Sequence, residues 1–542
     1  MPPSPTSTTA SETTAPTPAE LACLLEDFLV ANPAAVLLED GRILFDMRST
    51  HYSLSTEYGR CVLHLWSEEM NLIRTVLEVQ PRKGLLRLAT RRLGQTKPVF
   101  LEFVADRDRR TPTTRDAERR KYMRLLERVL TREFPDASAE AFRSAMDLEH
   151  SFGPAYARGI QLRGSSAWAV LGVNAEESSG TIDAALTLGI LWLDYCRQHS
   201  SGRRLFEGLR LVLPAGTEAT TASRMAWLNQ QSAQWQLYTL DAATEQLVPI
   251  DFTDTGNTAG ELTHTFDAPR TLERFAAATA RLLDLIPPAA RRRVELRPRS
   301  AAELAYLLEG LEFARVRIGF AGNTFTREET LTFGAGSQET LLDDDTTELF
   351  RELFERLAQS RTPNGLQQDP LFRLQSERWL EAHIRRNLAS LDTSLVPDVV
   401  YSQVTTSAAG ASGDRGLMDL LAIDRKGRLH ILELKTEEDM QLPMQALDYW
   451  IRVRRLNSDH PAAAGISNKG IFERSGYFPG HEVSLQVPLL TMVAPALRIH
   501  PSNEAVLRYL SPEVEWRILA IAEGWRREIQ VIFRKRSTDA KT

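Results

Sequence analysis

The chain is poor in cysteine, in long apolar runs and in net charge, and each absence excludes a class of protein. Only three cysteines occur among 542 residues. They lie far apart without a Cys-x-x-Cys pair, so we expect neither a zinc site nor a disulfide framework, but reduced thiols in a cytoplasmic protein. The longest apolar run, residues 184–193, lies between two aspartates and is too short to span a bilayer.

Charge and short motifs narrow the classes further. The formal net charge is −6, which does not indicate a nucleic-acid-binding protein, although a whole-chain sum can hide a local basic groove. The sequence contains no GxxxxGK[ST], no HExxH and no GxSxG. We therefore expect no ATPase motor, no zinc peptidase helix and no serine-hydrolase elbow.

The composition, with 43% hydrophobic and 25% charged residues, is that of an ordinary globular protein, and the length indicates several domains. The first residues are rich in Pro, Ser and Thr and lack the basic and apolar segments of a secretory signal. The fold class that we predict is α/β. The predicted parts are a disordered tail (1–18), a β-rich module (19–110), an α/β domain (111–255), an α/β linking region (256–365) and a C-terminal domain (366–542).

Within the linking region, the apolar spacing predicts helices at 270–285, 301–310 and 346–357 and strands at 314–320 and 329–333. The polar segment RTPNGLQQDP, residues 361–370, is a candidate linker. After it, SERWLEAHIRRN predicts a helix. A hairpin follows, in which LMDLLAID and RLHILELK are joined by a short turn.

This hairpin gathers polar residues on apolar strands. Side chains of a strand alternate between faces, so Glu433 and Lys435 share one face, and pairing of the two strands brings Asp419 near Glu433. Two facing carboxylates raise one another's pKa, and a hard cation relieves that cost. Mg²⁺ prefers one or two carboxylates together with water and phosphate oxygens. Lys435 would then orient or deprotonate the attacking water, or stabilise charge on a phosphate.

The run GLMDLLAIDRKGRLHILELK followed by QALDYW resembles the PD-(D/E)xK nuclease superfamily, and is most similar to the NucS/EndoMS-type and RecB-type branches. The resemblance covers about 170 residues and implies a restriction-endonuclease-like mixed sheet flanked by helices. It also implies that Asp419, Glu433 and Lys435 form the Mg²⁺-dependent active site, with Mn²⁺ as a substitute. The helix residues Gln445 and Tyr449 would complete this site. A Glu on the preceding helix would join the metal ligands Asp419 and Glu433, with Glu377 the first choice and Glu381 the second.

Each of these residues also has a simpler interpretation. Glu433 and Lys435 would then be a solvated pair at a strand edge, and Glu377 and Glu381 an exposed helix face. Gln445 and Tyr449 would be ordinary residues of an amphipathic helix. The run that contains Arg452, Arg454 and Arg455 is more typical of a solvated face than of phosphate contacts, and Asp414 and Arg415 belong to a loop of small residues.

The middle of the chain repeats the order of elements seen near the C-terminus. In both places a strand ending in Pro-Ala precedes a helix and a strand that begins with Trp, and Leu-Asp-Tyr ends an earlier helix. In this alignment, Gly172 stands at the place of Glu433 and Asn174 at that of Lys435. One hypothesis is therefore that residues 111–255 are a degenerate nuclease-like copy without a metal site; the alternative is a chance likeness between α/β sequences.

The sequence thus predicts a cytoplasmic, metal-dependent endo- or exodeoxyribonuclease acting in repair, restriction or defence. Nothing in the residues separates DNA from RNA. Its expected partner is nucleic acid rather than a membrane, and it would act as a homodimer or as an intramolecular pseudo-dimer. The alternative from another class is a nucleic-acid-binding or scaffold protein that keeps the nuclease fold without turnover. The complete Asp-Glu-Lys set favours the enzyme.

Overall fold

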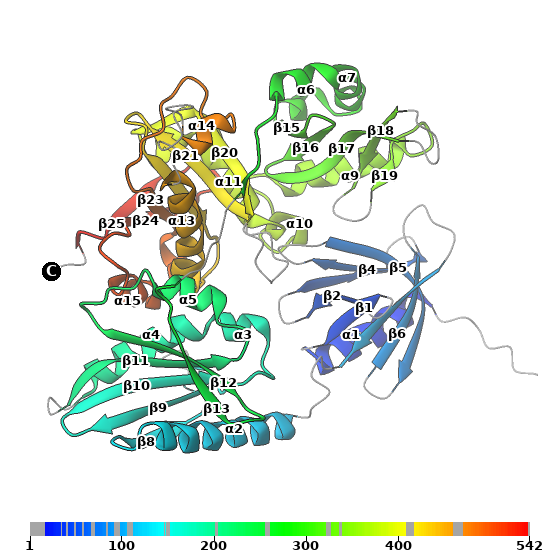
Figure 1. Ribbon diagram of the computed structural model, residues 1–542. Coiled ribbons are helices and arrows are strands. Elements are labelled where there is room, and N and C mark those ends of the chain that lie inside the picture. Colours follow the sequence, from blue (N-terminus) through cyan, green and yellow to red (C-terminus); the bar gives the residue numbers. More distant parts are fainter. Residues whose placement is uncertain are drawn as a thin grey trace, which may run out of the picture. The chain divides into compact units, whose positions relative to one another are not determined.

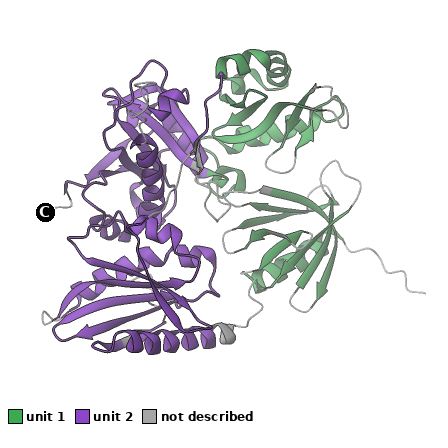
Figure 2. Cartoon of the chain, in the orientation of Figure 1, with its two compact units in different colours: residues 1–110, 268–375 green, residues 111–267, 376–542 purple. Residues whose placement is uncertain are grey.

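The computed structural model describes residues 17–33, 35–39, 42–47, 50–56, 59–66, 71–82, 85–91, 98–105, 112–145, 147, 152–200, 204–254, 261–320, 327–334, 339–407, 417–458 and 470–539. The chain is mixed α/β and divides into two compact units (Figure 2). Unit 1 contains residues 1–110 and 268–375, and unit 2 contains residues 111–267 and 376–542. Each unit is therefore discontinuous in sequence. The predicted disordered tail lies almost wholly outside the described residues, and so do Asp414 and Arg415.

The first part of unit 1 is a helix on an antiparallel sheet. Thr17 caps α1 (Pro18–Ala31) in a capping box with Glu20, and Leu21, Leu25 and Leu29 of α1 are buried. The sheet order is β2-β1-β7-β6-β5-β4-β3. Its strands are β1 (Val36–Glu39), β2 (Arg42–Asp46), β3 (His51–Ser55), β4 (Cys61–Trp66), β5 (Asn71–Arg82), β6 (Leu85–Arg91) and β7 (Val99–Val104).

The second part of unit 1 packs helices on an antiparallel meander of order β15-β16-β17-β18-β19. The helix predicted at 301–310 is wrong, because these residues contain β16 (Glu303–Leu308), which is buried on both faces and therefore shows no strand alternation. The other elements are α6 (Ala268–Arg274), α7 (Ala276–Asp284), α8 (Pro288–Arg291), β15 (Val294–Ser300), β17 (Leu311–Phe320), β18 (Arg327–Phe333), β19 (Thr340–Leu341), α9 (Thr347–Ser360) and α10 (Pro370–Arg373).

Unit 2 contains two sheets, and the first, of order β13-β12-β11-β10-β9-β8, belongs to residues 111–267. The apolar helix α4 packs on β10 and β11, and α2 contacts β8 and β9. The elements are α2 (Pro112–Glu133), β8 (Ser138–Arg143), β9 (Tyr156–Arg163), β10 (Ser166–Val173), α3 (Ser179–Asp183), α4 (Ala185–Gln198), β11 (Leu205–Pro214), α5 (Ala219–Met225), β12 (Gln234–Asp241) and β13 (Gln246–Ile250).

The second sheet of unit 2 has the order β14-β20-β21-β22-β23-β24-β25. Its edge strand β14 (Glu261–Leu262) comes from the sequence-based linking region and pairs with β20. Helix α13 packs on β22 and β23, and α11 contacts β20 and β22. The elements are α11 (Ser376–Arg386), α12 (Leu388–Leu391), β20 (Leu395–Ser407), β21 (Leu417–Asp424), β22 (Leu429–Leu434), α13 (Leu442–Ser458), α14 (Ile471–Arg474), β23 (Leu489–Pro495), η2 (Ala496–Arg498), α15 (Ser502–Arg508), β24 (Trp516–Ile521) and β25 (Val531–Arg536).

The two sheets of unit 2 share one plan. Along β8 to β13 the successive pairings are antiparallel, antiparallel, parallel, parallel and antiparallel, and the pairings along β20 to β25 follow the same order. Helices also take matching places, since α2 and α11 precede the sheets, α4 and α13 follow the third strands, and α5 and α15 the fourth (Figure 1). One hydrophobic core contains residues of both halves.

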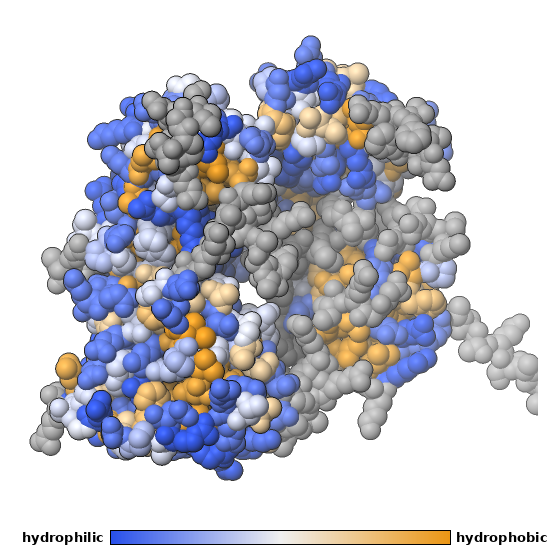
Figure 3. Space-filling model, viewed as in Figure 1, coloured by the Kyte–Doolittle hydropathy of each residue, from blue (hydrophilic) through white to orange (hydrophobic). Residues whose placement is uncertain are grey.

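The hydropathy of the helices bears on membranes. In the part of the chain that the structure describes, no helix has the length and apolar character needed to cross a bilayer. The face shown in Figure 3 mixes hydrophilic and hydrophobic residues over unit 2.

Candidate functional site

The hairpin of β21 and β22 places two acids side by side in the second sheet of unit 2. Leu420 pairs with Leu432, so Asp419 and Glu433, one residue further along each antiparallel strand, stand opposite each other. The backbone N–H of Leu434 donates a hydrogen bond to Oδ2 of Asp419 at 2.9 Å. The predicted approach of Asp419 to Glu433 is therefore present in the structure.

Of the two acids, Glu433 is buried and Asp419 is half-buried. Glu433 is only 4% exposed, and its Oε2 has no hydrogen-bond partner within the protein. Burial raises the pKa of Glu433 well above its ordinary value, and the charge of Asp419 raises it further. Burial also raises the pKa of Asp419 to about 6, even though the Leu434 N–H and nearby cations oppose this. A buried carboxylate with an unused oxygen, facing a second carboxylate, favours binding of a cation.

Lys435 follows directly after β22 and continues its pairing, since its N–H donates to the carbonyl of Val493 at 2.9 Å. Its Nζ lies 3.7 Å from Oε1 of Glu377 on α11 and 3.6 Å from Oδ2 of Asp439. The ammonium is thus held between two carboxylates at the end of the strand that carries Glu433. Asp439 was not singled out from the sequence, although the acidic run after Lys435 is visible there.

The second acid of α11 lies beside Asp419. Glu381 is 1% exposed; its Oε2 accepts hydrogen bonds from Arg378 at 2.9 Å and from Gln403 of β20 at 3.2 Å. Ser402 pairs with Leu420, so Gln403 stands next to Asp419 in the sheet. Gln403 has φ of 58°, a left-handed conformation that is strained for a residue with a Cβ. Nothing in the sequence distinguished Gln403 or Arg378.

The two helix residues of the predicted site lie on α13. Gln445 and Tyr449 are one turn apart and therefore share a face of the helix. Both are half-buried. Burial raises the pKa of Tyr449, and the charges of Glu433 and Asp419 raise it further, which places its hydroxyl in the electrostatic field of the acids. The guanidinium of Arg452 lies 6.0 Å from the centre of the Tyr449 ring.

These residues fit a hard divalent cation. Among the described residues, no three side chains of His, Cys, Asp or Glu converge as a ready-made metal cluster. Mg²⁺ does not require one, because it keeps several waters and is commonly bound by one or two carboxylates together with substrate phosphates. The unpartnered Oε2 of Glu433 beside Asp419 meets that requirement.

The strand registers identify the counterparts of these residues in the other sheet. Leu171 pairs with Leu211 and Glu433 with Met492, and each of these partners lies three residues before the proline that ends its strand. Leu171 therefore corresponds to Glu433, and Val173 to Lys435. The alignment with Gly172 and Asn174 is wrong by one residue.

Gly172 in fact faces the other side of the sheet. A Cβ on Gly172 would lie 2.6 Å from Cδ2 of Leu126 and 2.9 Å from the hydroxyl of Tyr122, both on α2. The alignment failed because β10 is buried on both faces. Its apolar run therefore shows no alternation from which the face of each residue could be assigned.

An arginine stands where the second sheet has Asp419. Leu171 pairs with Arg158, as Glu433 does with Asp419. Arg158 is 1% exposed, and its guanidinium carbon lies 4.7 Å from the ring centre of Phe152 and 5.9 Å from that of Trp192. Its Nη2 donates to the carbonyl of Ala145 at 2.8 Å. A buried cation beside Leu171 and Val173 disfavours any divalent metal at this place.

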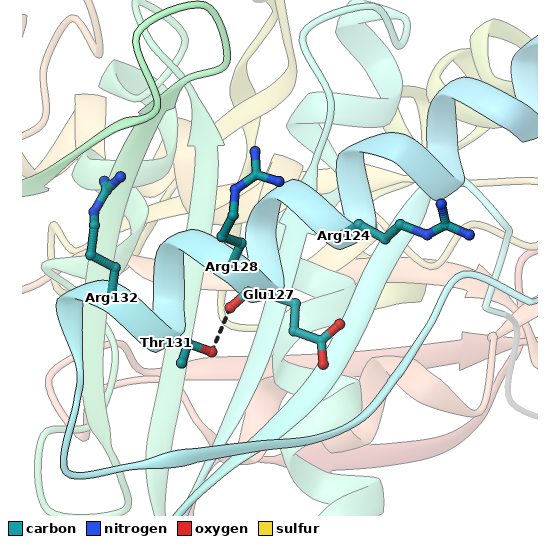
Figure 4. Close-up of a pocket in the computed structure, with 5 residues that line it drawn as sticks. All are labelled: Arg124, Glu127, Arg128, Thr131 and Arg132. Carbon is teal, nitrogen blue, oxygen red and sulfur yellow. Dashed lines mark hydrogen bonds between the residues drawn. The ribbon is translucent and has the colours of Figure 1, made fainter.

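A separate pocket lies on the exposed face of α2 (Figure 4). Its lining residues are Arg124, Glu127, Arg128, Thr131 and Arg132. Glu245 pairs with both Arg128 and Arg132, and the Thr131 hydroxyl donates to the carbonyl of Glu127 at 2.8 Å. These pairs neutralise much of the basic character, so we regard the pocket as a solvated helix face.

Comparisons of the chain with family models, with curated proteins and with solved structures found no match.

Proposed function

We propose that residues 376–542 are the catalytic domain of a magnesium-dependent nuclease of the PD-(D/E)xK type. The observation that carries the proposal is the pairing of the buried Glu433 with the half-buried Asp419, with Lys435 at the end of the strand that carries Glu433. The order of elements supports it, because α11, the β21–β22 hairpin and α13 occupy the places that the resemblance implies for the preceding Glu, the metal site and the Gln-x-x-x-Tyr helix.

Asp419 and Glu433 would hold the cation, with Glu377 near enough to Lys435 to join the site when substrate enters. A bound Mg²⁺ supplies positive charge that offsets the charge developing on a phosphodiester during hydrolysis. The burial of both carboxylates disfavours their ionisation without a cation, so uptake of the metal is coupled to loss of protons from the pair.

The reaction consumes one water. The water oxygen forms a bond to phosphorus, one bridging P–O bond breaks, and a proton passes to the departing oxygen, leaving a phosphate monoester and a hydroxyl. Lys435 donates hydrogen bonds to the attacking water or to a phosphate oxygen, and its two carboxylate partners fix its position. Tyr449, whose pKa is raised by burial and by the charges of Glu433 and Asp419, would complete the site from α13 together with Gln445 on the same helix face.

DNA is the substrate that we propose, in keeping with the resemblance, and a role in repair, restriction or defence follows from it. The test is a cleavage assay on linear, nicked, single-stranded and mismatched DNA and on RNA, with Mg²⁺ or Mn²⁺ against EDTA. We expect metal-dependent cutting that falls by at least about 100-fold in Glu433→Ala and in Lys435→Ala, because each removes a group that acts at the reacting phosphate.

Matched controls are exposed residues of the same types outside the site, Glu513→Ala and Lys426→Ala. Both should cut like the unmodified protein. Metal-dependent cutting that survives Glu433→Ala and Lys435→Ala would refute the site. An absence of cutting on every substrate would instead favour the alternative of a binding or scaffold protein that retains the nuclease fold.

A further inference from the structure

The two halves of unit 2 meet through matching elements. Helix α4 of the first half contacts α15 of the second, and α13 of the second contacts α5 of the first. In the shared plan of the sheets, α4 matches α13 and α5 matches α15. The two contacts are therefore equivalent, with the roles of the two halves exchanged. Such reciprocity is the property of an isologous, twofold-related interface.

The centre of this interface is a short backbone bridge between equivalent residues. Leu228 forms an isolated antiparallel bridge with Leu510. Leu228 lies three residues after the end of α5, and Leu510 lies two residues after the end of α15. The N–H of Asn229 donates to the carbonyl of Tyr509, and that of Ser511 donates to the carbonyl of Trp227, both at 2.8 Å. The two hydrogen bonds exchange roles under a twofold rotation.

Side chains repeat the same reciprocity. The Thr187 hydroxyl donates to Oε1 of Gln441 at 2.7 Å, and each of these residues precedes the Asp of a Leu-Asp-Tyr motif by seven positions. Each of these two aspartates also forms an ion pair with an arginine of the other half. Asp448 binds Arg224 of the first half at 2.7 Å, and Asp194 binds Arg508 of the second at 3.3 Å.

The pairing face of the nuclease-like half is therefore already covered from within the chain. A second copy of the protein has no access to the faces of α13 and α15 that contact α5 and α4. The covering half does not supply a second centre, since Arg158, Leu171 and Val173 stand at the places of the two acids and the lysine.

We propose that residues 111–267 are a fused, catalytically empty subunit, so that each chain carries one active centre and cuts one strand of a duplex per binding event. This inference rests on the proposed nuclease function. A homodimeric nuclease with two centres can break both strands while it remains bound. Here one water is consumed and one bridging P–O bond is broken, and the product on closed circular DNA is a nicked circle.

The experiment follows supercoiled plasmid with the full chain and Mg²⁺, and measures nicked and linear DNA against time. We expect nicked circles to accumulate first, with linear DNA only after a lag, from independent nicks. Sedimentation equilibrium should give the 60.9 kDa mass of one chain without DNA. With a short duplex it should give the mass of one chain plus one duplex. The last measurement adds an excess of the Lys435→Ala chain. In a homodimer, mixed dimers with one working centre would form and lower the ratio of linear to nicked DNA. For a single-chain enzyme we expect this ratio to stay unchanged.

The outcomes separate this inference from the proposed function. Linear DNA formed without a lag, or a two-chain mass on the duplex, overturns the single-centre inference while cutting itself still supports the nuclease. If no substrate is cut, the proposed function fails and the single-strand product with it, and a one-chain mass then supports only the covered pairing face.

Discussion

Glu433 combines several features that lower the stability of the folded protein. A carboxylate that is 4% exposed, with one oxygen lacking a partner and an acid opposite it, destabilises the fold when it ionises. Sites that bind a cation commonly carry such a cost, because the ligand relieves it on binding. These features fit the role that we propose for Glu433 as a metal ligand.

Replacement of this carboxyl by its neutral isostere should therefore stabilise the metal-free protein. In EDTA at about pH 8, we expect Glu433→Gln to raise the free energy of unfolding by roughly 1–3 kcal/mol, measured by urea denaturation. The folded pKa is raised, so the advantage should vanish near pH 4, where Glu433 is protonated in both states. The exposed control Glu513→Gln should have little effect. A loss of stability in Glu433→Gln at about pH 8 would show that the carboxylate is well satisfied.

His430 makes the stability of the fold fall as the pH falls, whereas Glu433 makes it fall as the pH rises. It is buried, and burial together with the charge of Arg517 lowers its pKa to about 4, against the opposing charges of Asp424 and Asp392. The folded pKa lies below the unfolded value, so the stabilisation is complete above about pH 6.5 and is lost as the pH falls towards 4.

We expect this residue to contribute up to about 3 kcal/mol to the loss of stability between about pH 7 and pH 4. The measurement is the urea midpoint across that range, in the unmodified protein and in His430→Gln. The variant should lose less stability on acidification. Equal pH slopes in the two proteins would contradict the assigned shift.

At the scale of the element, the hairpin turn decides which residues face each other. Gly427 has φ of 82°, and a Cβ there would lie 2.3 Å from the carbonyl oxygen of Glu482. The carbonyl of Gly427 also accepts a hydrogen bond from the N–H of Ser484 at 2.7 Å. The turn is therefore clamped by a neighbouring loop, which fixes the register that brings Asp419 opposite Glu433.

Gly427→Ala should destabilise the protein by about 2–4 kcal/mol in urea denaturation, because it adds a backbone clash to the cost of a left-handed alanine. Gly480 is a matched control, with φ of 80° and nothing within 4 Å of an added Cβ. Gly480→Ala should cost only about 1 kcal/mol. Equal costs at the two positions would mean that the loop yields and does not clamp the turn.

The elements of the site also differ in how well the sequence predicts them. The hairpin and its three polar residues were predictable, because a short turn and an acid in an apolar strand are local features. Strands buried on both faces were not, and this explains both the misassigned β16 and the one-residue error at Gly172. Gln403 reaches the site through a tertiary contact that no local pattern encodes. Asp439 and Arg378 form ion pairs with residues four and three positions away, but local charge pairs of this kind are common on solvated surfaces and did not single them out.

At the scale of the whole molecule, the two halves of unit 2 are joined by an ion network around a buried arginine. The side chain of Arg224 is 3% exposed and binds Asp183 at 2.9 Å within its own half and Asp448 at 2.7 Å across the interface. Its counterpart in the reciprocal pair, Arg508, is 51% exposed. The two positions therefore compare a buried and a solvated ion pair within one interface.

We expect Arg224→Ala to lower the free energy of unfolding by about 2–4 kcal/mol, because it leaves two carboxylates without their buried partner. Arg508→Ala should change it by less than about 0.5 kcal/mol, as for other exposed pairs. Both are measured by denaturant unfolding followed by tryptophan fluorescence. Similar losses in the two variants would refute the distinction between the pairs.

The order of the chain gives the shared core of unit 2 a consequence for its biosynthesis. Within unit 2, residues 111–267 leave the ribosome before residues 376–542, and residues 268–375, which belong to the other unit, are made in between. Throughout that interval the surfaces of α4 and α5 that will contact α15 and α13 are uncovered in the nascent chain. Slower translation lengthens this exposure, so the yield of folded protein should depend on elongation rate and on chaperones that shield apolar helices.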